Sequence, residues 1–275
     1  MAVDIESQAE VVVPPQAAAL PVSVRVRAEG QVLVVTLARP RKRNALDDAT
    51  IGALERVFRE IAPAYRAAVL DAEGDHFSAG LDLHELAERD AFAGVAHSQF
   101  WHRAMEAIDG GQVPTVAALT GAVVGGGLEL AAACHLRVAD RSAFYALPEG
   151  QRGLFVGGGG SVRLPRLIGV ARVMDLMLTG RRLDADEGQA AGLTQYLVET
   201  GTASAAALEL ARRIAGNAPQ TNFAVLRALP RIAQASPDEG YLLESLMAAV
   251  AQSTEDAKQR MASFLAGRAP KVTDL

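Results

Sequence analysis

Two glutamates in one stretch of the chain have the surroundings that acid–base chemistry requires. The stretch runs from Val116 to Glu149 and reads VAALTGAVVGGGLELAAACHLRVADRSAFYALPE. Glu129 lies in the apolar segment GGGLELAAAC, where a charged side chain is costly unless it is used or paired. Because desolvation raises the pKa of a carboxyl group, Glu129 is suited to general acid or base work. The alternative role for either glutamate is a carboxylate at a helix start, which accepts hydrogen bonds from backbone N–H groups.

Glycines beside Glu129 predict a site for developing negative charge. Val116 to Leu119 has the length and composition of a buried strand, and LELAAAC is a strong helix-forming run. Gly121 opens a turn, and Gly125 to Gly127 precede the helix, where glycine lets the backbone approach a ligand closely. The free N–H groups and the positive end of the helix dipole then face that ligand. The stretch therefore predicts two carboxylates and an oxyanion site.

Other chemical motifs are weaker. The glycines from Gly121 to Gly127 lack the dinucleotide spacing, and Gly157 to Gly160 lacks the Lys-Ser/Thr of a phosphate-binding loop. The five histidines show no metal-ligand spacing, so no metal site is predicted. Ser78 beside His76 suggests a nucleophile and a base, but without an acidic partner in view a structural role is favoured.

Composition limits the function classes. A chain of 275 residues, half of them apolar, can bury one sizeable core and a smaller appendage. The net charge of −5 argues against a nucleic-acid-binding surface. No apolar run is long enough to span a bilayer, and the N-terminus does not read as a secretory signal. The single cysteine, Cys134, lies in an apolar helical run and indicates a reducing compartment. We therefore predict a cytoplasmic protein with no membrane or nucleic-acid partner.

The elements that position these residues alternate between strands and helices. Residues 1–21 are Ala-, Pro-, Gln- and Glu-rich and are predicted to be a mobile arm. The expected elements in order are a hairpin of Ser23–Arg27 and Gln31–Leu37, a helix capped by Asp47 or Asp48, a strand at Ala67–Leu70, a helix at Ala91–Ile108, helices at Val170–Leu178 and Asp184–Ala191, and a strand at Gln195–Val198. From Ala203 the pattern is wholly helical, in three or four segments broken near Pro219, Pro237 and Ser253. The alternation predicts a parallel-rich α/β core with right-handed crossovers, residues 22–200, followed by a C-terminal helical region, residues 201–275.

Beyond the N-terminal arm, the chain contains an ordered series of motifs: RPRKRNAL at Arg39, HFSAGLDL at His76, VVGGGLELAAAC at Val123, LPEGQRG at Leu147, GGGGSVRL at Gly157, LTGRRLDADEGQAAGLT at Leu178, and EDAKQRMASFLAGR near the C-terminus. With these motifs in this order, the chain resembles the crotonase, or enoyl-CoA hydratase/isomerase, superfamily. The resemblance implies a crotonase-like ββα superhelix core, a C-terminal helical trimerisation region, and a homotrimer or dimer of trimers. It also implies an acyl-CoA thioester substrate of the kind used in fatty acid β-oxidation, and no cofactor apart from the coenzyme A of the substrate.

The resemblance also implies roles for individual residues. The backbone N–H groups of Leu81 and Gly126 would bind the thioester oxygen, and loss of one such donor typically costs ~10²–10³ in rate. Contacts with coenzyme A would come from Arg41, Lys42, Ser78, Ala79, Gly80, Asp82 and Leu83. The acyl pocket would involve Leu86, Leu147 and Gly157.

Glu129 and Glu149 fall on the positions of the two glutamates that hydratases of this family use. The expected reaction is therefore reversible syn addition of water to a trans-2-enoyl-CoA, with Glu149 supplying the Cα proton and Glu129 activating water. The chain departs from the family pattern at Leu81, at His135 and after Glu149, near the acyl pocket, so substrate choice or reaction type can differ. The alternatives are an enoyl-CoA isomerase, an aryl-enoyl-CoA hydratase-lyase, a catalytically silent CoA-binding subunit, and a serine peptidase using Ser78.

Overall fold

A computed structural model describes residues 20–85 and 90–268 of the chain. The chain divides into two compact units, Met1–Arg213 and Ile214–Leu275. The predicted mobile arm lies almost entirely outside the described residues, and the boundary expected after residue 200 stays a prediction. The first unit contains both sheets and every residue of the site discussed below.

The larger sheet of the first unit contains six strands within the described residues, in the order β1-β2-β3-β4-β6-β9. The strands are β1 Val24–Glu29, β2 Val32–Leu37, β3 Ala67–Ala72, β4 Thr115–Leu119, β6 Leu136–Asp140 and β9 Tyr196–Val198. Strands β1 and β2 form the predicted antiparallel hairpin, and the remaining pairs are parallel. The prediction of a parallel-rich α/β core is confirmed.

A second sheet carries the chain toward both glutamates. Its strands are β5 Ala122–Val124, β7 Phe144–Ala146 and β8 Arg182–Leu183. Strands β5 and β7 are parallel, with Val124 opposite Ala146, so their carboxyl ends meet at one edge. The glycines before Glu129 follow β5, and Glu149 follows β7 three residues after Ala146. The register of this small sheet therefore brings the two glutamates together.

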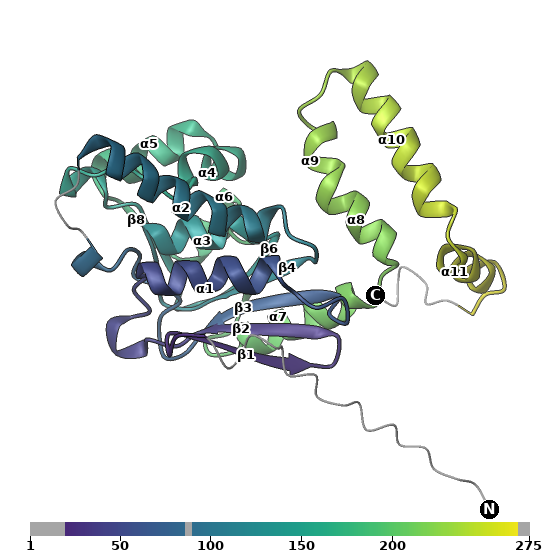
Figure 1. The fold of residues 1–275 in the computed structure, drawn as a ribbon, viewed down its shortest axis with the longest axis horizontal. Coiled ribbons are helices and arrows are strands. Elements are labelled where there is room, and N and C mark those ends of the chain that lie inside the picture. The colour runs from purple at the N-terminus through teal and green to yellow at the C-terminus, as the bar shows by residue number, and fades with distance from the viewer. Residues whose placement is uncertain (1–19, 86–89, 269–275) are drawn as a thin grey trace, which may run out of the picture. The chain divides into compact units, whose positions relative to one another are not determined.

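The helices of the first unit mostly begin and end where the sequence predicts. The α-helices are α1 Asp48–Arg59, α2 Ala91–Asp109, α3 Gly126–Ala133, α4 Gly160–Ile168, α5 Val170–Thr179, α6 Ala185–Ala191 and α7 Ala203–Ala215. The last residues of α7 lie in the second unit. Short 3-10 helices are η2 Pro40–Lys42, η3 Leu83–Glu85 and η4 Gly150–Arg152. Asp47 caps α1 by accepting a hydrogen bond from the Thr50 N–H group, which decides between the two predicted caps. Helix α1 buries Ile51, Leu54 and Val57 and packs against α2 (Figure 1).

Helix α4 was not predicted. Its sequence begins in a glycine run and contains Pro165, and both features count against a helix. It forms nevertheless, with Leu164 and Ile168 buried, because packing of an apolar face contributes more to helix stability than intrinsic propensity does.

The second unit is helical throughout its ordered elements. It contains α8 Pro219–Arg227, α9 Leu229–Ile232, α10 Pro237–Gln252 and α11 Glu255–Leu265, so the breaks predicted near Pro219, Pro237 and Ser253 are confirmed. Ser236 and Glu239 form a capping box at the start of α10, which fixes where that helix begins.

Candidate active site

A cavity of about 430 Å³ in the first unit holds both candidate glutamates in its wall. The wall comes from the chain just before η3, from α2, from the turn between β5 and α3, from η4 and its flanks, and from the glycine run before α4. Most of it is apolar, as is usual for a small-molecule site with a few polar groups.

Glu129 lies in the first turn of α3 and is 4% exposed. Its Oε1 accepts hydrogen bonds from the N–H groups of Gly158 and Gly160, each at 2.8 Å. Burial raises the pKa of Glu129 most strongly, the charge of Glu149 adds to the rise, and the glycine N–H groups oppose it. The carboxylate thus accepts from N–H groups, as the alternative reading expected, but they belong to the glycine run rather than to its own helix start.

Gly160 is required by the close approach of Glu129. A Cβ at Gly160 would lie 2.7 Å from Cγ of Glu129, so a side chain there would push the carboxylate away. A Cβ at Gly158 would lie 3.4 Å from the Glu129 carboxyl carbon, which is ordinary van der Waals contact. The glycine run was noticed in the sequence, but no sequence pattern indicated that its N–H groups donate to Glu129.

Glu149 immediately precedes η4 and also lines the cavity. Its Oε2 is buried and has no hydrogen-bond partner among the described residues. Burial raises the pKa of the Glu149 carboxyl group, while the cation of Arg152 acts in the opposite direction. A Cβ at Gly125 would lie 2.5 Å from Oε1 of Glu149, and Gly125 has a φ of +54°. Only glycine fits a position that combines this close approach with a left-handed backbone.

The backbone N–H groups of Leu81 and Gly126 lie close together in the wall that holds these carboxylates. A Cβ at Gly126 would lie 3.4 Å from the Leu81 nitrogen, and a Cβ at Gly80 would lie 3.2 Å from the Gly126 nitrogen. Neither the Leu81 nor the Gly126 N–H group has an acceptor within residues 20–85 and 90–268. Gly126 is the first residue of α3, where the helix dipole favours negative charge. The arrangement can bind an oxyanion.

Ser78 holds the loop that carries the Leu81 N–H group. Its fully buried Oγ donates to the Asn44 carbonyl oxygen at 2.8 Å and accepts from the Gly80 N–H group at 3.1 Å. The nearby ring of His76 accepts instead from the N–H group of Ala122. The Ser78 hydroxyl therefore has a structural environment, which supports the structural role over the nucleophilic one.

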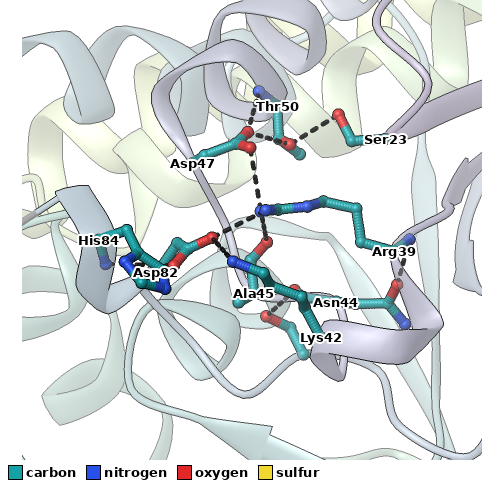
Figure 2. Close-up of polar contacts among 10 residues, drawn as sticks. Ser23, Arg39, Lys42, Asn44, Ala45, Asp47, Thr50, Asp82 and His84 are labelled. Atoms are coloured by element: carbon teal, nitrogen blue, oxygen red, sulfur yellow. Dashed lines mark hydrogen bonds and ion pairs between the residues drawn. The ribbon is translucent and has the colours of Figure 1, made fainter.

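Two of the predicted coenzyme A contacts, Lys42 and Asp82, belong to a cluster of ion pairs around the basic loop (Figure 2). Arg39 pairs with Asp82 at 2.8 Å and with the α1 cap Asp47 at 3.0 Å, and Lys42 pairs with Asp82 at 3.5 Å. Burial alone would raise the pKa of Asp82, but hydrogen bonds from the His84 N–H group and Arg39, with the Lys42 charge, outweigh it and lower that pKa.

The remaining predicted site residues are divided between two hollows and the core. Ala79, Gly80, Leu81, Leu83 and Gly157 line the cavity with the glutamates. Arg41 and Lys42 line a separate hollow of about 280 Å³ on the basic loop. Ser78, Asp82 and Leu147 are buried beneath the surface and do not line the cavity, and Leu86 lies outside the described residues.

Several cavity residues were missed from the sequence. Helix α2 contributes His97, Ser98 and Trp101, and η4 and its flank contribute Arg152 and Phe155. His97 Nε2 lies 2.8 Å from Oδ1 of Asp48 at the start of α1, and the buried indole of Trp101 is 6.2 Å from the His97 ring. Their helical spacing was visible, but it is also the spacing of ordinary core residues.

The Cys134 thiol is not activated, and the described residues form no cluster of metal ligands. Burial raises the pKa of the Cys134 thiol to about 12, so it behaves as a small apolar residue. Across the described ranges, no three His, Cys, Asp or Glu side chains gather as metal ligands would. No described helix is both long enough and apolar enough to cross a membrane.

The comparisons with known proteins agree on one family. The family model for "Enoyl-CoA hydratase/isomerase" matches residues 27–274. Over 200 residues, the chain is 33% identical to a short-chain-enoyl-CoA hydratase of Clostridium acetobutylicum, covering 72% of this chain and 77% of the relative. It is 36% identical over 206 residues to a putative enoyl-CoA hydratase/isomerase of Bacillus subtilis, covering 71% and 78%. The crystal structure of a putative enoyl-CoA hydratase from Rhodopseudomonas palustris is 59% identical, with a TM-score of 0.87 and coverage of 90% and 95%.

Proposed function

The chain belongs to the enoyl-CoA hydratase/isomerase family, and we propose that within it the protein is a hydratase. It catalyses the reversible syn addition of water to a trans-2-enoyl-CoA and yields a 3-hydroxyacyl-CoA. One observation carries this proposal: a single cavity holds the buried Glu129 and the half-buried Glu149 beside two neighbouring N–H groups that lack acceptors among the described residues.

The two N–H groups supply the electrostatic part of the reaction. When water attacks Cβ of the enoyl thioester, negative charge moves onto the thioester oxygen. The N–H groups of Leu81 and Gly126 are held by backbone geometry, so they stabilise that oxygen without reorganising.

The two carboxyl groups supply the proton transfers. Glu129, held by Gly158 and Gly160, orients the water and accepts a proton as the oxygen bonds to Cβ. Glu149, whose Oε2 has no protein partner among the described residues, delivers a proton to Cα. Raised pKa values suit both groups to exchange protons near neutral pH. Because both face one water and Glu149 influences the pKa of Glu129, they titrate as a coupled pair.

The substrate supplies the only coenzyme that this reaction needs. Hydration transfers no electrons, and its protons come from water and the carboxyl groups, so we expect neither a redox cofactor nor a metal. We propose that Arg41 and Lys42 bind phosphates of coenzyme A at the basic hollow, while the backbone of residues 79–81 contacts the thioester arm. A cytoplasmic homotrimer or dimer of trimers, formed through the C-terminal helices, is part of the same proposal.

The test is loss of the enoyl-thioester absorbance with crotonyl-CoA and with longer and aryl enoyl-CoAs. Wild type is expected to hydrate at least one of them, and Glu129→Gln and Glu149→Gln are expected to lose several orders of magnitude in kcat. Absence of turnover with every enoyl-CoA, while CoA esters still bind, would overturn the hydratase proposal. Product analysis would then decide between an isomerase or lyase and a silent CoA-binding subunit.

A further inference from the structure

Arg152 lies on the same side of a short helix as Glu149. Helix η4 spans Gly150–Arg152, and the Arg152 N–H group donates to the Glu149 carbonyl oxygen at 2.9 Å. Side chains three residues apart in a 3-10 helix eclipse one another. The side chains of Glu149 and Arg152 therefore leave the same face of the helix, and both residues line the cavity, with Arg152 exposed.

The cation has no acidic partner in the part of the chain that the structure describes. Within that part, Arg152 is also the only lysine or arginine in the cavity wall. Arginines of the first unit near the cavity behave differently: Arg163 pairs with Asp109 at 3.1 Å, and Arg39 pairs with Asp82. The charge of Arg152 acts to lower the pKa of the Glu149 carboxyl group, in keeping with the position of both residues in one cavity wall.

The surroundings of Arg152 favour an anionic ligand group. Pro148, Leu154 and Phe155, which line the cavity and are close to Arg152 in sequence, offer no acceptor side chain. Glu149 is the acidic residue closest to Arg152 in this wall, and within the described residues the two form no ion pair. A guanidinium presents a planar fork of N–H donors that matches a carboxylate in bidentate fashion. Arg41 and Lys42, the residues proposed above to bind the phosphates of coenzyme A, line a separate hollow. With the phosphates bound there, the acyl group is the part of the substrate that would lie near Arg152 and Glu149 in the cavity.

We propose that Arg152 binds a carboxylate carried by the acyl group. The preferred substrates are then enoyl-CoAs whose acyl chain ends in a carboxylate, that is, monothioesters of unsaturated dicarboxylic acids. This inference rests on the proposed function for its site, but the binding preference can be measured without turnover.

The test compares two substrates that differ only in charge. Glutaconyl-CoA carries a terminal carboxylate, and its monomethyl ester is neutral and of similar size. Wild type is expected to show kcat/KM about ten- to a hundredfold higher for the carboxylate, as a charge-assisted bidentate contact provides. Arg152→Gln should lower the ratio of the two kcat/KM values toward one, and Arg152→Glu should invert it. Arg152→Lys should restore part of the preference, because the charge is kept but the fork is lost.

Controls separate this preference from other roles. Arg166→Gln, at an exposed position of α4 outside the cavity wall, should leave the ratio unchanged. If Arg152→Gln lowers both kcat/KM values equally and shifts the pH profile, Arg152 acts only on Glu149 and the inference is overturned. If it weakens free coenzyme A as a competitor to the same extent, the anion is a phosphate and the inference is likewise overturned.

Binding of saturated analogues tests the carboxylate preference of Arg152 separately from the hydratase function. Calorimetry with glutaryl-CoA and its methyl ester should show the same charge preference in wild type and its loss in Arg152→Gln. A protein that hydrates the neutral ester better than glutaconyl-CoA would overturn the inference and leave the hydratase function standing. A protein that hydrates neither but still prefers glutaryl-CoA would overturn the hydratase function and support the role of Arg152.

Discussion

The indole of Trp101 occupies the space that a side chain at Gly126 would need. A Cβ at Gly126 would lie 2.9 Å from Cζ3 of Trp101, and a Cβ at Gly158 would lie 3.1 Å from Cε3 of the same ring. Gly126 provides a proposed oxyanion donor, and Gly158 donates to Glu129. One buried ring is therefore packed against both backbone segments that the chemistry uses, which links the oxyanion site to the acid–base site.

This packing predicts the effect of Gly126→Ala. The added methyl group must displace either the indole or the N–H group, so we expect kcat to fall about 10²–10³-fold, as for loss of an oxyanion donor. Circular dichroism should show that the variant still folds. Gly94→Ala is the control, because Gly94 also lines the cavity but a Cβ there meets no atom within 4 Å. Equal effects of the two substitutions would contradict the packing argument.

The effects of Gly126→Ala and Trp101→Ala on kcat should also be coupled. Trp101→Ala removes the ring that Gly126→Ala would strike, so the double variant should lose less than the product of the single losses. Independent losses in the double variant would show that Trp101 does not set the position of Gly126.

The ionised Glu129 carboxylate is predicted to lower the free energy of unfolding at neutral pH. Burial raises its pKa in the folded state, so its contribution to stability is greatest below the unfolded value of about 4.3 and is lost as pH rises through the folded value. Glu129→Gln keeps an acceptor for Gly158 and Gly160 but removes the charge, so it should raise the free energy of unfolding at neutral pH. Urea unfolding at several pH values measures this gain, which should vanish below about pH 4.3.

The matched control for that measurement is Glu106→Gln, an exposed glutamate on α2. It should show no comparable gain at any pH. A destabilised Glu129→Gln at neutral pH would mean that the ionised carboxylate is more favourable in its site than its burial indicates.

Asp82 is predicted to have the opposite pH dependence. Its folded pKa is lowered, so its contribution is present above the unfolded value of about 3.9 and is lost as pH falls through the folded value. Asp82→Asn should cost about 1–3 kcal/mol at neutral pH, because Arg39 and Lys42 lose a charged partner. The cost should shrink on acidification, whereas Asp75→Asn, an exposed site in a nearby loop, should cost little at any pH.

Ser78 provides a test of the peptidase alternative. A fluorophosphonate probe should not label it, because its hydroxyl is fully buried and bonded to the Asn44 carbonyl and the Gly80 N–H group. Ser78→Ala should destabilise the protein by about 1–3 kcal/mol, since both backbone groups lose a buried partner. Labelling that disappears in Ser78→Ala would revive the nucleophilic role.

The sequence predicted those features that depend on neighbouring residues. Glu129 stands out because it is a charge in an apolar helix, and Asp47 because a cap precedes a periodic run. The local hairpin of β1 and β2 was predicted for the same reason.

Features that depend on distant pairing were not predictable. The approach of Gly125 to Glu149 requires β5 and β7 to pair in register. The hydrogen bond from the Gly160 N–H group to Glu129 joins residues far apart in the chain. The ion pair of Arg39 with Asp82 and the insertion of Trp101 against two glycines are likewise tertiary contacts. No local pattern encodes them, although the glycine positions were a usable signal of close approach.

The measurement that tests the central claim most directly is isotope incorporation during turnover of an enoyl-CoA in ¹⁸O-labelled water. The hydratase account predicts a 3-hydroxyacyl-CoA with one solvent oxygen at Cβ, detected by mass spectrometry. It also predicts that Glu129→Gln and Glu149→Gln each abolish most incorporation, and that the double variant loses little more than either single one, because the residues act on one water. Migration of the double bond without labelled oxygen in wild type would contradict the account and indicate an isomerase.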